Sequence, residues 1–365
     1  MQRWAIDIDR DDITIATLVD LPEAALPPGA IEVAIDLVAM TANNVTYAAL
    51  GKPTGLLGKD VGYWDFFADR DVPGRLPVWG FATVVRSDVD GIAPGEELYG
   101  YWPLATHAVL LPERVGAIGF VDATPRRGAL PTFYNRYQRL RALDDYAITD
   151  RSYWPVFRPL YLTGWLVADQ LVDAGYHGAE QVLVTAASSK TALGFAHAMR
   201  EREDRPDLVA LTSAANAGFV RSTKLYDRVV LYDDVAGLDT EMHAALVDFA
   251  GNAAVKAAAH DHFAAALTLD LVVGVTHWDA QRAATPLSGV RPTGFFAPAR
   301  IEKRTADWGG AGLRDRIAGA WQRFMVDART LTRLDERGGA EAALAAYRDA
   351  VAGAADARAS VVITP

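Results

Sequence analysis

The chain has 365 residues and a formal net charge of −10, and 51% of its residues are hydrophobic against 22% that are charged. This length suits about two domains of ordinary size, and the composition excludes a disordered protein, because it supplies enough apolar residues for buried cores. The absence of cysteine excludes disulfides, thiolate nucleophiles, iron–sulfur clusters and cysteine-based zinc sites. The acidic balance argues against nucleic acid as a partner, because neutralising phosphates requires a surface rich in lysine and arginine.

Membrane and targeting segments are not evident in the sequence. No apolar run reaches the ~18 residues that a membrane-spanning helix needs. The charged N-terminal segment MQRWAIDIDRDD lacks the apolar core of a signal peptide. We therefore expect a soluble, cytoplasmic protein with no membrane partner.

Patterns typical of β-strands recur through the first 120 residues. Alternating or apolar runs cover residues 13–19, 31–40, 78–85 and 106–111. Turn signals such as Pro73-Gly74 and Pro94-Gly95 separate these runs. This spacing is typical of a small, irregular barrel-like domain.

Strands and helices alternate in the second half of the chain. We expect a helix over 160–173 that ends at Gly175, and a second helix over 192–203. Apolar strands are expected at 181–185, 208–212, 228–232, 246–250 and 269–275. Strands that are apolar on both faces and separated by helices indicate a parallel sheet covered on both sides. A final Ala-rich helix over 339–355 precedes a strand over 360–364, which we expect to return to the first domain.

The turn after the first of these parallel strands is the candidate cofactor site. A dinucleotide site needs small residues there, so that the backbone approaches the pyrophosphate, and a helix N-terminus aimed at the anion. The chain offers Ala186, Ser188, Ser189, Lys190 and Thr191, whose hydroxyls and amine can bind phosphate. The alternative is a structural turn that binds nothing, with Ser189 as the helix N-cap. A P-loop is disfavoured, because both glycines that this motif requires are absent.

The end of the second parallel strand bears on which nicotinamide cofactor binds. An acidic residue there binds the ribose 2′-hydroxyl of NAD, whereas its absence suits the 2′-phosphate of NADP. Residues 213–222 contain no carboxylate, and Ser213, Asn216 and Arg221 can bond a phosphate. NADP(H) is therefore the predicted cofactor. In the alternative, Asn216 is only the cap of the next helix.

Taken together, these segments resemble the medium-chain dehydrogenase/reductase superfamily, in particular its zinc-independent quinone- and enoyl-reductase branch. The similar stretches are Pro27-Pro28-Gly29 with 32–35, residues 42–47 with Gly51, residues 80–85 and 94–100, Leu162-Thr163-Gly164-Trp165, and Phe295-Phe296. The segments ASSKTA and FYNRY are more similar to a subfamily catalogued as a domain of unknown function, DUF2855. The superfamily's own glycine-rich turn would fall on Ala186, Ser189 and Ala192, so both of its glycines are replaced.

The resemblance implies an α/β protein of two domains. Residues 1–155 and 340–365 would form a GroES-like β-barrel catalytic domain. Residues 156–339 would form a Rossmann-like cofactor domain with a doubly wound parallel sheet. By analogy with the superfamily, a homodimer would form through the strand at 269–275.

The resemblance also implies roles for individual residues. Thr163 falls where the family places a threonine near the nicotinamide, and Phe295-Phe296 where an aromatic pair flanks the carboxamide. Asn43 and Tyr47 fall in the segment that lines the active site. Without a metal, a hydroxyl, an amide or a backbone N–H must polarise the substrate oxygen.

Further candidates come from the basic and aromatic segment near residue 134. Tyr134 joins Asn43 and Tyr47 as a candidate catalytic residue, while Arg136 and Tyr137 suit an anionic substrate. Alternatively, Tyr47 is a packing aromatic between domains, and YNRYQR is a surface helix whose arginines pair with nearby aspartates. The aromatic residues Tyr63, Trp64, Phe66, Phe67, Trp79 and Trp102 either line a hydrophobic cleft or fill domain interfaces.

No metal site is expected. The only histidine cluster, His260-Asp261-His262, is interpreted as a solvated surface pair, because positions i and i+2 of a helix point apart. His107 lies in an expected strand and is interpreted as packed or capped rather than catalytic.

The sequence thus favours an NADPH-dependent, zinc-free oxidoreductase that reduces an activated C=C bond or a quinone by hydride transfer. A small-molecule substrate is its expected partner. The alternative is a catalytically silent dinucleotide-binding protein of the same fold, because the glycine-rich turn is altered. A third hypothesis keeps the fold but uses Arg136 to bind an anionic substrate in a different reaction.

Overall fold

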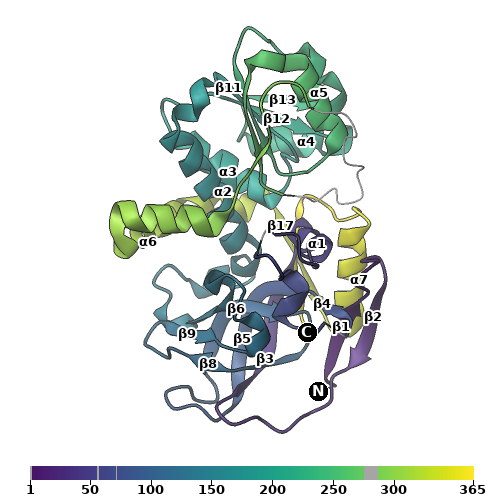
Figure 1. The fold of residues 1–365 in the computed structure, drawn as a ribbon, viewed down its shortest axis with the longest axis vertical. Coiled ribbons are helices and arrows are strands. Elements are labelled where there is room, and N and C mark those ends of the chain that lie inside the picture. The colour runs from purple at the N-terminus through teal and green to yellow at the C-terminus, as the bar shows by residue number, and fades with distance from the viewer. Residues whose placement is uncertain (1, 56, 71, 275–286) are drawn as a thin grey trace. The chain divides into compact units, whose positions relative to one another are not determined.

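The computed structural model describes residues 2–55, 57–70, 72–274 and 287–365, which form two compact units (Figure 1). Unit 1 comprises Met1–Val156 and Arg333–Pro365, and unit 2 comprises Phe157–Thr332. Unit 1 begins again at Arg333, ahead of the expected position 340, because β17 (Arg333–Gly338) pairs with β18 (Ala359–Thr364).

Unit 1 consists mainly of antiparallel strands in two sheets. The larger sheet has the order β17, β18, β3 (Ile31–Met40), β5 (Pro77–Ser87), β6 (Glu97–Pro103), β10 (Arg136–Arg139), β9 (Gly119–Asp122), β8 (Pro112–Glu113), with β7 (His107–Leu110) also on β3. The smaller sheet joins β2 (Ala16–Asp20), β1 (Trp4–Ile8) and β4 (Gly74–Arg75). Two helices, α1 (Ala42–Ala49) and α7 (Ala340–Val351), belong to this unit.

The C-terminal strand completes the larger sheet of unit 1, as the sequence predicts. In β18, Val361 pairs with Met40 and Ile363 with Val38 of β3. On its other side, β3 approaches β5 so closely that a Cβ at Gly80 would lie 2.1 Å from the carbonyl oxygen of Leu37. Only glycine permits this contact, which explains the glycine in the middle of a buried strand.

Unit 2 is built on a parallel sheet. Its order is β13 (Arg228–Leu231), β12 (Asp207–Thr212), β11 (Gln181–Val184), β14 (Ala244–Asp248), β15 (Leu267–Val272), β16 (Thr293–Gly294), and each neighbouring pair is parallel. Counted along the chain within the unit, this is the doubly wound order 3-2-1-4-5-6. The predicted Rossmann-like fold is therefore confirmed. Val275, the last residue of one expected strand, lies outside the described residues.

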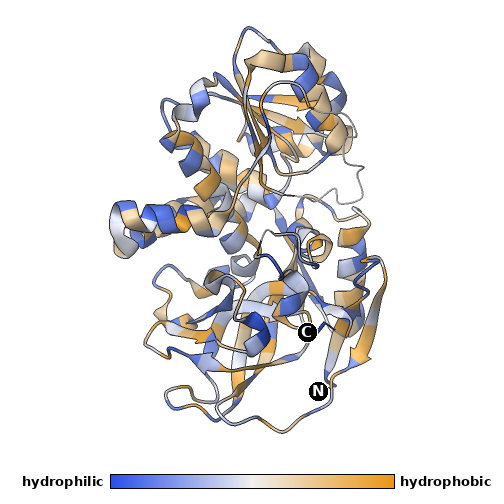
Figure 2. Ribbon diagram, viewed as in Figure 1, coloured by the Kyte–Doolittle hydropathy of each residue, from blue (hydrophilic) through white to orange (hydrophobic). Residues whose placement is uncertain are grey.

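The strands of unit 2 are buried because helices cover the sheet. Every residue of β11 and β14 is buried, and Figure 2 shows hydrophobic strands beside helices of mixed hydropathy. The helices are α2 (Trp154–Asp173), α3 (Lys190–Arg200), α4 (Ala214–Thr223), α5 (Ala253–Phe263) and α6 (Ala297–Leu331). Short 3₁₀ helices are η1 (Tyr63–Phe66), η2 (Pro125–Arg127), η3 (Thr132–Asn135), η4 (Leu140–Ala142), η5 (Ile148–Asp150), η6 (Gly175–Gly178), η7 (Tyr232–Gly237) and η8 (Ala264–Ala266).

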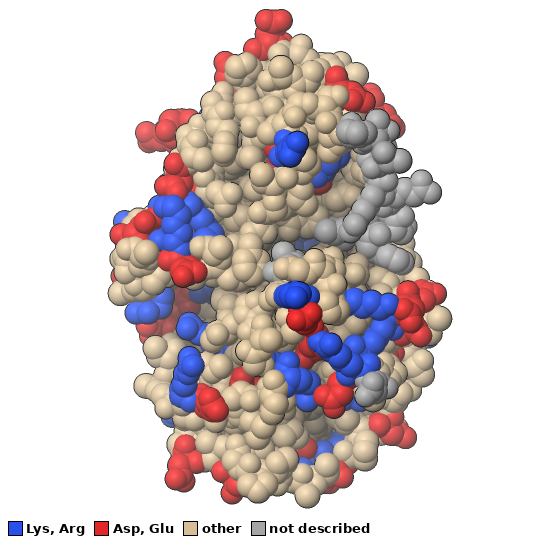
Figure 3. Space-filling view, viewed as in Figure 1, with Lys and Arg blue, Asp and Glu red and all other residues tan. Residues whose placement is uncertain are grey.

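Two helices differ from the sequence prediction. Helix α2 begins at Trp154 rather than near residue 160, and Pro159 lies inside it. Helix α6 was not predicted, and it has a non-helical residue at Gly309, where φ is 72°. Within the described part of the chain, no helix combines the length and hydropathy that crossing a bilayer requires. On the face seen in Figure 3, basic and acidic side chains are interspersed.

Candidate functional site

The candidate cofactor site lies at the carboxyl edge of the unit 2 sheet. Parallel strands end at the same edge, so the residues after β11, β12 and β13 lie along it: Ala186, Ser213 and Tyr232. The chain order reverses between β11 and β14. Open α/β sheets bind their ligands outside the carboxyl ends of the strands at such a switch point.

Two tyrosine hydroxyls fix the turn between β11 and α3. The backbone N–H of Ala186 donates to Oη of Tyr232 at 3.2 Å, and Oη of Tyr226 donates to the carbonyl of Ala187 at 2.8 Å. Ala186 has a φ of 45°, in the left-handed region that favours glycine. The turn therefore adopts a conformation that glycine usually supplies, although no glycine is present.

The first turn of α3 presents donors for an anion. Ser189 is the N-cap, and its Oγ accepts a hydrogen bond from the amide of Ala192 at 3.3 Å, so the predicted capping role is confirmed. Among the residues that the structure describes, the hydroxyls of Ser188 and Thr191 form no hydrogen bond. Lys190 is the first residue of α3 and is half-buried. Two hydroxyls, an amine and a helix N-terminus suit a phosphate group.

The structure separates the three residues expected to bind the 2′-phosphate. Ser213 is the N-cap of α4, and Asn216 lies inside the helix, so the alternative that Asn216 is the cap is wrong. The helix begins two residues before Asn216, and Ser213 is at the N-cap position without a side-chain capping hydrogen bond. Arg221 is exposed in the last turn, about 10 Å along the axis from the first residue of α4. Only Ser213 and Asn216 therefore lie near the carboxyl edge.

Helix α2 holds Thr163 beside the same turn. A Cβ at Gly164 would lie 2.5 Å from the backbone nitrogen of Phe195 and 2.7 Å from the carbonyl oxygen of Thr191, so α2 and α3 are in direct backbone contact. The Thr163 hydroxyl donates to the carbonyl of Pro159 at 3.0 Å. This contact fixes the threonine one residue from the crossing of the two helices.

The expected aromatic pair lies at the end of the neighbouring strands. The amide of Phe295 donates to the carbonyl of Val272 at 2.8 Å, which places Phe295 at the carboxyl end of β15. Phe296 is the N-cap residue of α6. Both therefore lie on the edge of the sheet that also carries Ala186 and Ser213.

A buried charged network supports the loop after β14. The Thr185 hydroxyl donates to Asp248 Oδ1 at 2.7 Å and accepts from the amide of Phe249 at 2.9 Å. Lys256 Nζ lies 3.1 Å from Asp248 Oδ2 and 3.3 Å from Asp270 Oδ2. The network thus ties the end of β14 to β15 through α5. Asp248 and Asp270 were the signal in the sequence that could have revealed this network, since each is the charged residue of a largely apolar strand.

The interpretation of His260 as a solvated residue is wrong. Its side chain is fully buried, with Nε2 2.9 Å from Asp270 Oδ2 and Nδ1 2.6 Å from the carbonyl oxygen of Ser288. His262 is half-buried and lies 2.8 Å from the carbonyl oxygen of Leu238. The two rings do point apart, but α5 turns the first of them towards the sheet. In the described part of the chain, no group of three His, Asp or Glu side chains could hold a metal ion.

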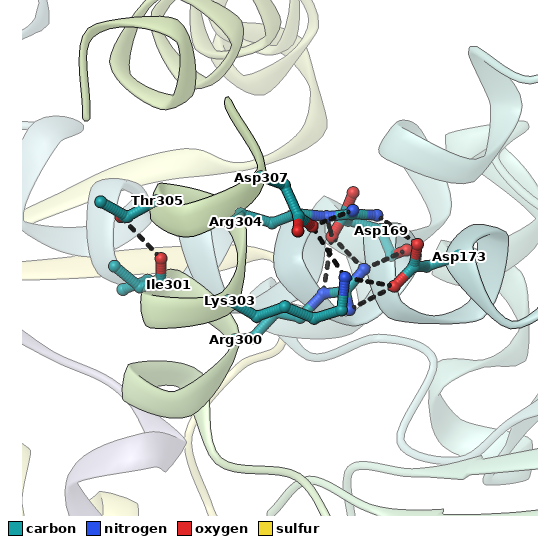
Figure 4. Close-up of polar contacts among 8 residues, drawn as sticks. All are labelled: Asp169, Asp173, Arg300, Ile301, Lys303, Arg304, Thr305 and Asp307. Atoms are coloured by element: carbon teal, nitrogen blue, oxygen red, sulfur yellow. Dashed lines mark hydrogen bonds and ion pairs between the residues drawn. The ribbon is translucent and has the colours of Figure 1, made fainter. Parts of the chain in front are cut away.

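A second charged cluster joins α2 to α6 (Figure 4). Asp169 Oδ2 accepts hydrogen bonds from Nε of Arg300 at 2.6 Å and Nε of Arg304 at 2.8 Å. Asp173 Oδ2 accepts another from Nη1 of Arg300 at 2.8 Å, which holds the pKa of Asp173 well below its usual range. These contacts anchor the start of α6, which follows directly on Phe296.

Unit 1 gathers four tyrosines, which we call the tyrosine cluster: Tyr47, Tyr63, Tyr101 and Tyr134. Their ring centroids are 4.6 Å apart for Tyr47 and Tyr63 and 5.3 Å apart for Tyr101 and Tyr134. They come from α1, η1, β6 and η3, which are distant in sequence. Tyr101 was missed because nothing in the strand around it distinguishes its hydroxyl from a packing group.

The hydroxyls of the tyrosine cluster differ in their hydrogen bonds. Oη of Tyr63 lies 3.5 Å from Oη of Tyr134, and Oη of Tyr101 is buried with no partner in the described part of the chain. Nε1 of Trp79 donates to Oη of Tyr47 at 3.3 Å, and Asn43 lies one turn earlier on α1. Burial raises the pKa of Tyr47 and that of Tyr134 above the usual value. Both phenols therefore keep their protons at neutral pH and can polarise an oxygen atom or supply a proton to it.

The two residues predicted to bind substrate lie in different surroundings. Tyr137 is buried, and its hydroxyl donates to the carbonyl of Tyr101 at 2.6 Å and accepts from Nη1 of Arg127 at 2.9 Å. Burial raises the pKa of Tyr137 to about 12. Arg136 is exposed on β10. The surface-helix alternative is wrong, since η3 and β10 form this segment.

The other aromatic residues fill the interior of unit 1. Trp64, Phe66 and Trp102 are fully buried, and Nε1 of Trp102 donates to the carbonyl of Gly80 at 2.9 Å. His107 lies in β7 and is half-buried. Packing in the interior of unit 1 thus explains most of these aromatic residues.

A unit completed by a returning C-terminal strand, together with a doubly wound parallel sheet, defines the medium-chain dehydrogenase/reductase fold. CurA from Vibrio vulnificus in complex with NADPH is similar with a TM-score of 0.64 and 12% identity, covering 99% of this chain and 98% of that one. The yhdH oxidoreductase from Salmonella enterica in complex with NADP has a TM-score of 0.54 and 18% identity, with 100% of both chains covered. CurK enoyl reductase has a TM-score of 0.56 and 11% identity, with coverage of 100% and 99%.

The chain belongs to the family described as protein of unknown function (DUF2855), whose family model matches residues 38–356. No curated protein matches the sequence. The resemblance to this subfamily is therefore confirmed, and the similar structures share the fold of the chain.

Proposed function

We propose that this protein is an NADPH-dependent, zinc-independent oxidoreductase that reduces an activated C=C bond or a quinone. The observation that carries the proposal is the turn at Ala186, whose left-handed backbone and adjoining free hydroxyls reproduce an anion site without glycine. The NADPH and NADP complexes of the similar structures support the choice of cofactor.

The carboxyl edge of unit 2 would hold the cofactor. Ser188, Lys190, Thr191 and the amides at the start of α3 would bind the pyrophosphate. Ser213 and Asn216 would receive the 2′-phosphate, since no carboxylate follows β12 in residues 213–222 to repel it. Arg221 has no part in this proposal, because it lies at the far end of α4.

Thr163, Phe295 and Phe296 would orient the nicotinamide, which supplies a hydride when the cofactor is bound. Unit 1 would supply the polar groups for the substrate. Tyr47 and Tyr134 would donate hydrogen bonds to its oxygen atom, and Tyr47 would deliver the proton that balances the added charge. Asn43 would orient Tyr47. Tyr137 is left out, because Tyr101 and Arg127 already use its hydroxyl.

Zinc independence is proposed from ligand chemistry. The sequence has no cysteine, and the described residues contain no three-membered cluster of other ligands. A homodimer through the sheet edge also stays a proposal. The edge strand in the described residues is the two-residue β16, beside β15, and sedimentation of the purified protein would measure the oligomeric state.

Titration with NADPH, followed by nicotinamide fluorescence, tests cofactor binding directly. We expect Thr191→Val to weaken binding about tenfold by removing one hydrogen bond to a charged group. Thr223→Val is the matched control. Its hydroxyl is in the last turn of α4, away from the proposed cofactor site, and donates to the carbonyl of Val220. Absence of any fluorescence change with the unmodified protein would refute the proposal.

A catalytically silent dinucleotide-binding protein is the second candidate. It is favoured by the amide of Ala186, which already donates to Tyr232 and so is not free for the cofactor. Incubation of the protein with NADPH and a panel of enones and quinones separates the two functions. Enzyme-dependent oxidation of NADPH with any of them would exclude the silent protein.

A further inference from the structure

Unit 1 contains a cavity of about 240 Å³ that the proposed reaction does not use. Its polar wall comes from separate elements: Arg3 precedes β1, Glu32 lies in β3, Arg75 in β4, His107 in β7 and Arg126 in η2. The apolar wall includes Leu21, Phe67, Pro103 and Val109. None of the residues assigned to cofactor or substrate lines it.

Part of the positive charge at this wall is already neutralised within the protein. Buried Glu32 accepts hydrogen bonds from Nη1 of Arg3 at 2.7 Å and from Nε of Arg86 at 2.6 Å. Arg75 uses Nε to bond Asp7 Oδ1 at 3.1 Å, and within the described residues no other nitrogen of its guanidinium forms a hydrogen bond. The other N–H groups of Arg75 therefore stay available on the guanidinium plane.

Arg126 is the least neutralised cation at the cavity. Its nearest carboxylate, Asp69, lies at 3.9 Å and is 76% exposed, so water screens the pair. Its Nε donates to the carbonyl of Phe66 at 3.4 Å. Burial lowers the pKa of Arg126 below its usual value, which shows that neighbouring carboxylates do not fully replace the lost hydration.

His107 provides a second, independent observation. Within the described residues, its Nδ1 is buried and has no hydrogen-bond partner. A buried polar atom without a partner is rare in folded proteins, and a bound molecule is one way to satisfy it. The unpartnered nitrogen belongs to a residue that lines the same cavity as Arg126.

We propose that this cavity binds a small carboxylate with an apolar body. The carboxylate accepts hydrogen bonds from Arg126 and Arg75, since a planar guanidinium matches the two oxygens of a carboxylate. The ring of His107 borders the ligand, and the apolar body packs on Phe67 and Val109. The volume limits the ligand to one smaller than a typical drug-sized molecule.

Isothermal titration calorimetry with benzoate, butyrate and inorganic phosphate at constant ionic strength tests the proposal. We expect saturable binding of benzoate or butyrate and at least tenfold weaker binding by Arg126→Gln. The matched control Arg141→Gln removes the same charge from a residue that is 72% exposed, and its affinity should equal that of the unmodified protein. Phosphate should bind more weakly, because it offers no apolar surface.

Several results would overturn the proposal. The first is the absence of carboxylate binding up to about 10 mM. The second is an Arg126→Gln variant that binds the carboxylates as tightly as the unmodified protein does. The third is phosphate that binds as tightly as the carboxylates. If Arg126→Gln does not fold, NMR of the unmodified protein provides the second measurement. Benzoate should then shift the ring signals of His107 and leave those of His262 unchanged, and the absence of a shift at His107 would equally overturn the proposal.

Discussion

Replacing Asp169 by Asn should destabilise unit 2 strongly. The Asp169 side chain is 4% exposed, and its partners Arg300 and Arg304 are 6% and 8% exposed. Asparagine keeps the size of the side chain but removes the only buried negative charge of the cluster, so two guanidiniums remain buried beside a neutral amide. Removing one partner of a buried ion pair costs about 3–5 kcal/mol. We expect a loss of about 3 kcal/mol, because Asp173 still faces both arginines.

Urea unfolding followed by far-UV circular dichroism measures this loss. Asp307→Asn is the control: it removes partners of Arg304 and Lys303 at a carboxylate that water reaches, so its effect should be much smaller. The triple variant Asp169→Leu, Arg300→Met, Arg304→Met should recover most of the stability, since apolar residues of similar volume replace buried ion pairs well. A loss below about 1 kcal/mol for Asp169→Asn, the range of exposed pairs, would refute the reasoning.

Three further predictions concern the turn, the helix crossing and pH. Ala186→Gly should raise the free energy of unfolding by about 0.5–1 kcal/mol, since relief of the strain in the left-handed backbone outweighs the added freedom of the unfolded chain. A lower free energy of unfolding, measured with urea, would contradict this prediction. Gly164→Ala should lower the free energy of unfolding by about 1–3 kcal/mol, because the new Cβ meets backbone atoms of α3. An unchanged melting temperature would contradict this, since it would show that α2 and α3 can separate to admit the methyl group. Hydrogen bonds from Arg300 and Arg205 lower the pKa values of Asp173 and Asp227. Their stabilisation is therefore present above the unfolded pKa near 4 and is lost as pH falls below it, so the urea midpoint should be constant down to about pH 5 and fall progressively below that.

The parallel sheet of unit 2 was predictable because its signal is local. Strands such as Val182–Val184 are apolar on both faces, which only a covered parallel sheet explains. Helix α6 shows the limit of this reasoning. Its first turns bury Arg300 and Arg304 in place of apolar residues, so nothing apolar marks the start of the helix. From Leu313 to Ala328 its buried face is an apolar stripe, which is a signal that the sequence interpretation overlooked.

The candidate site was predictable only where its residues are neighbours in sequence. The turn from Ala186 to Thr191 follows directly from the succession of strand, small residues and helix. Tyr226 and Tyr232 reach this turn from either side of β13 in the sequence, and no local pattern shows that contact. His260 is a similar case, because helical periodicity separates it from His262 but does not reveal which ring faces Asp270.

The position of β18 also has a consequence for synthesis of the protein. Residues 157–332 of unit 2 are contiguous, whereas unit 1 needs β18 between β3 and β17. On the ribosome, unit 2 can fold while β3 still lacks one of its neighbours and exposes an unpaired edge. The larger sheet of unit 1 therefore cannot be completed until β18 has been synthesised. During this interval the unpaired edge of β3 can pair with strands of other chains.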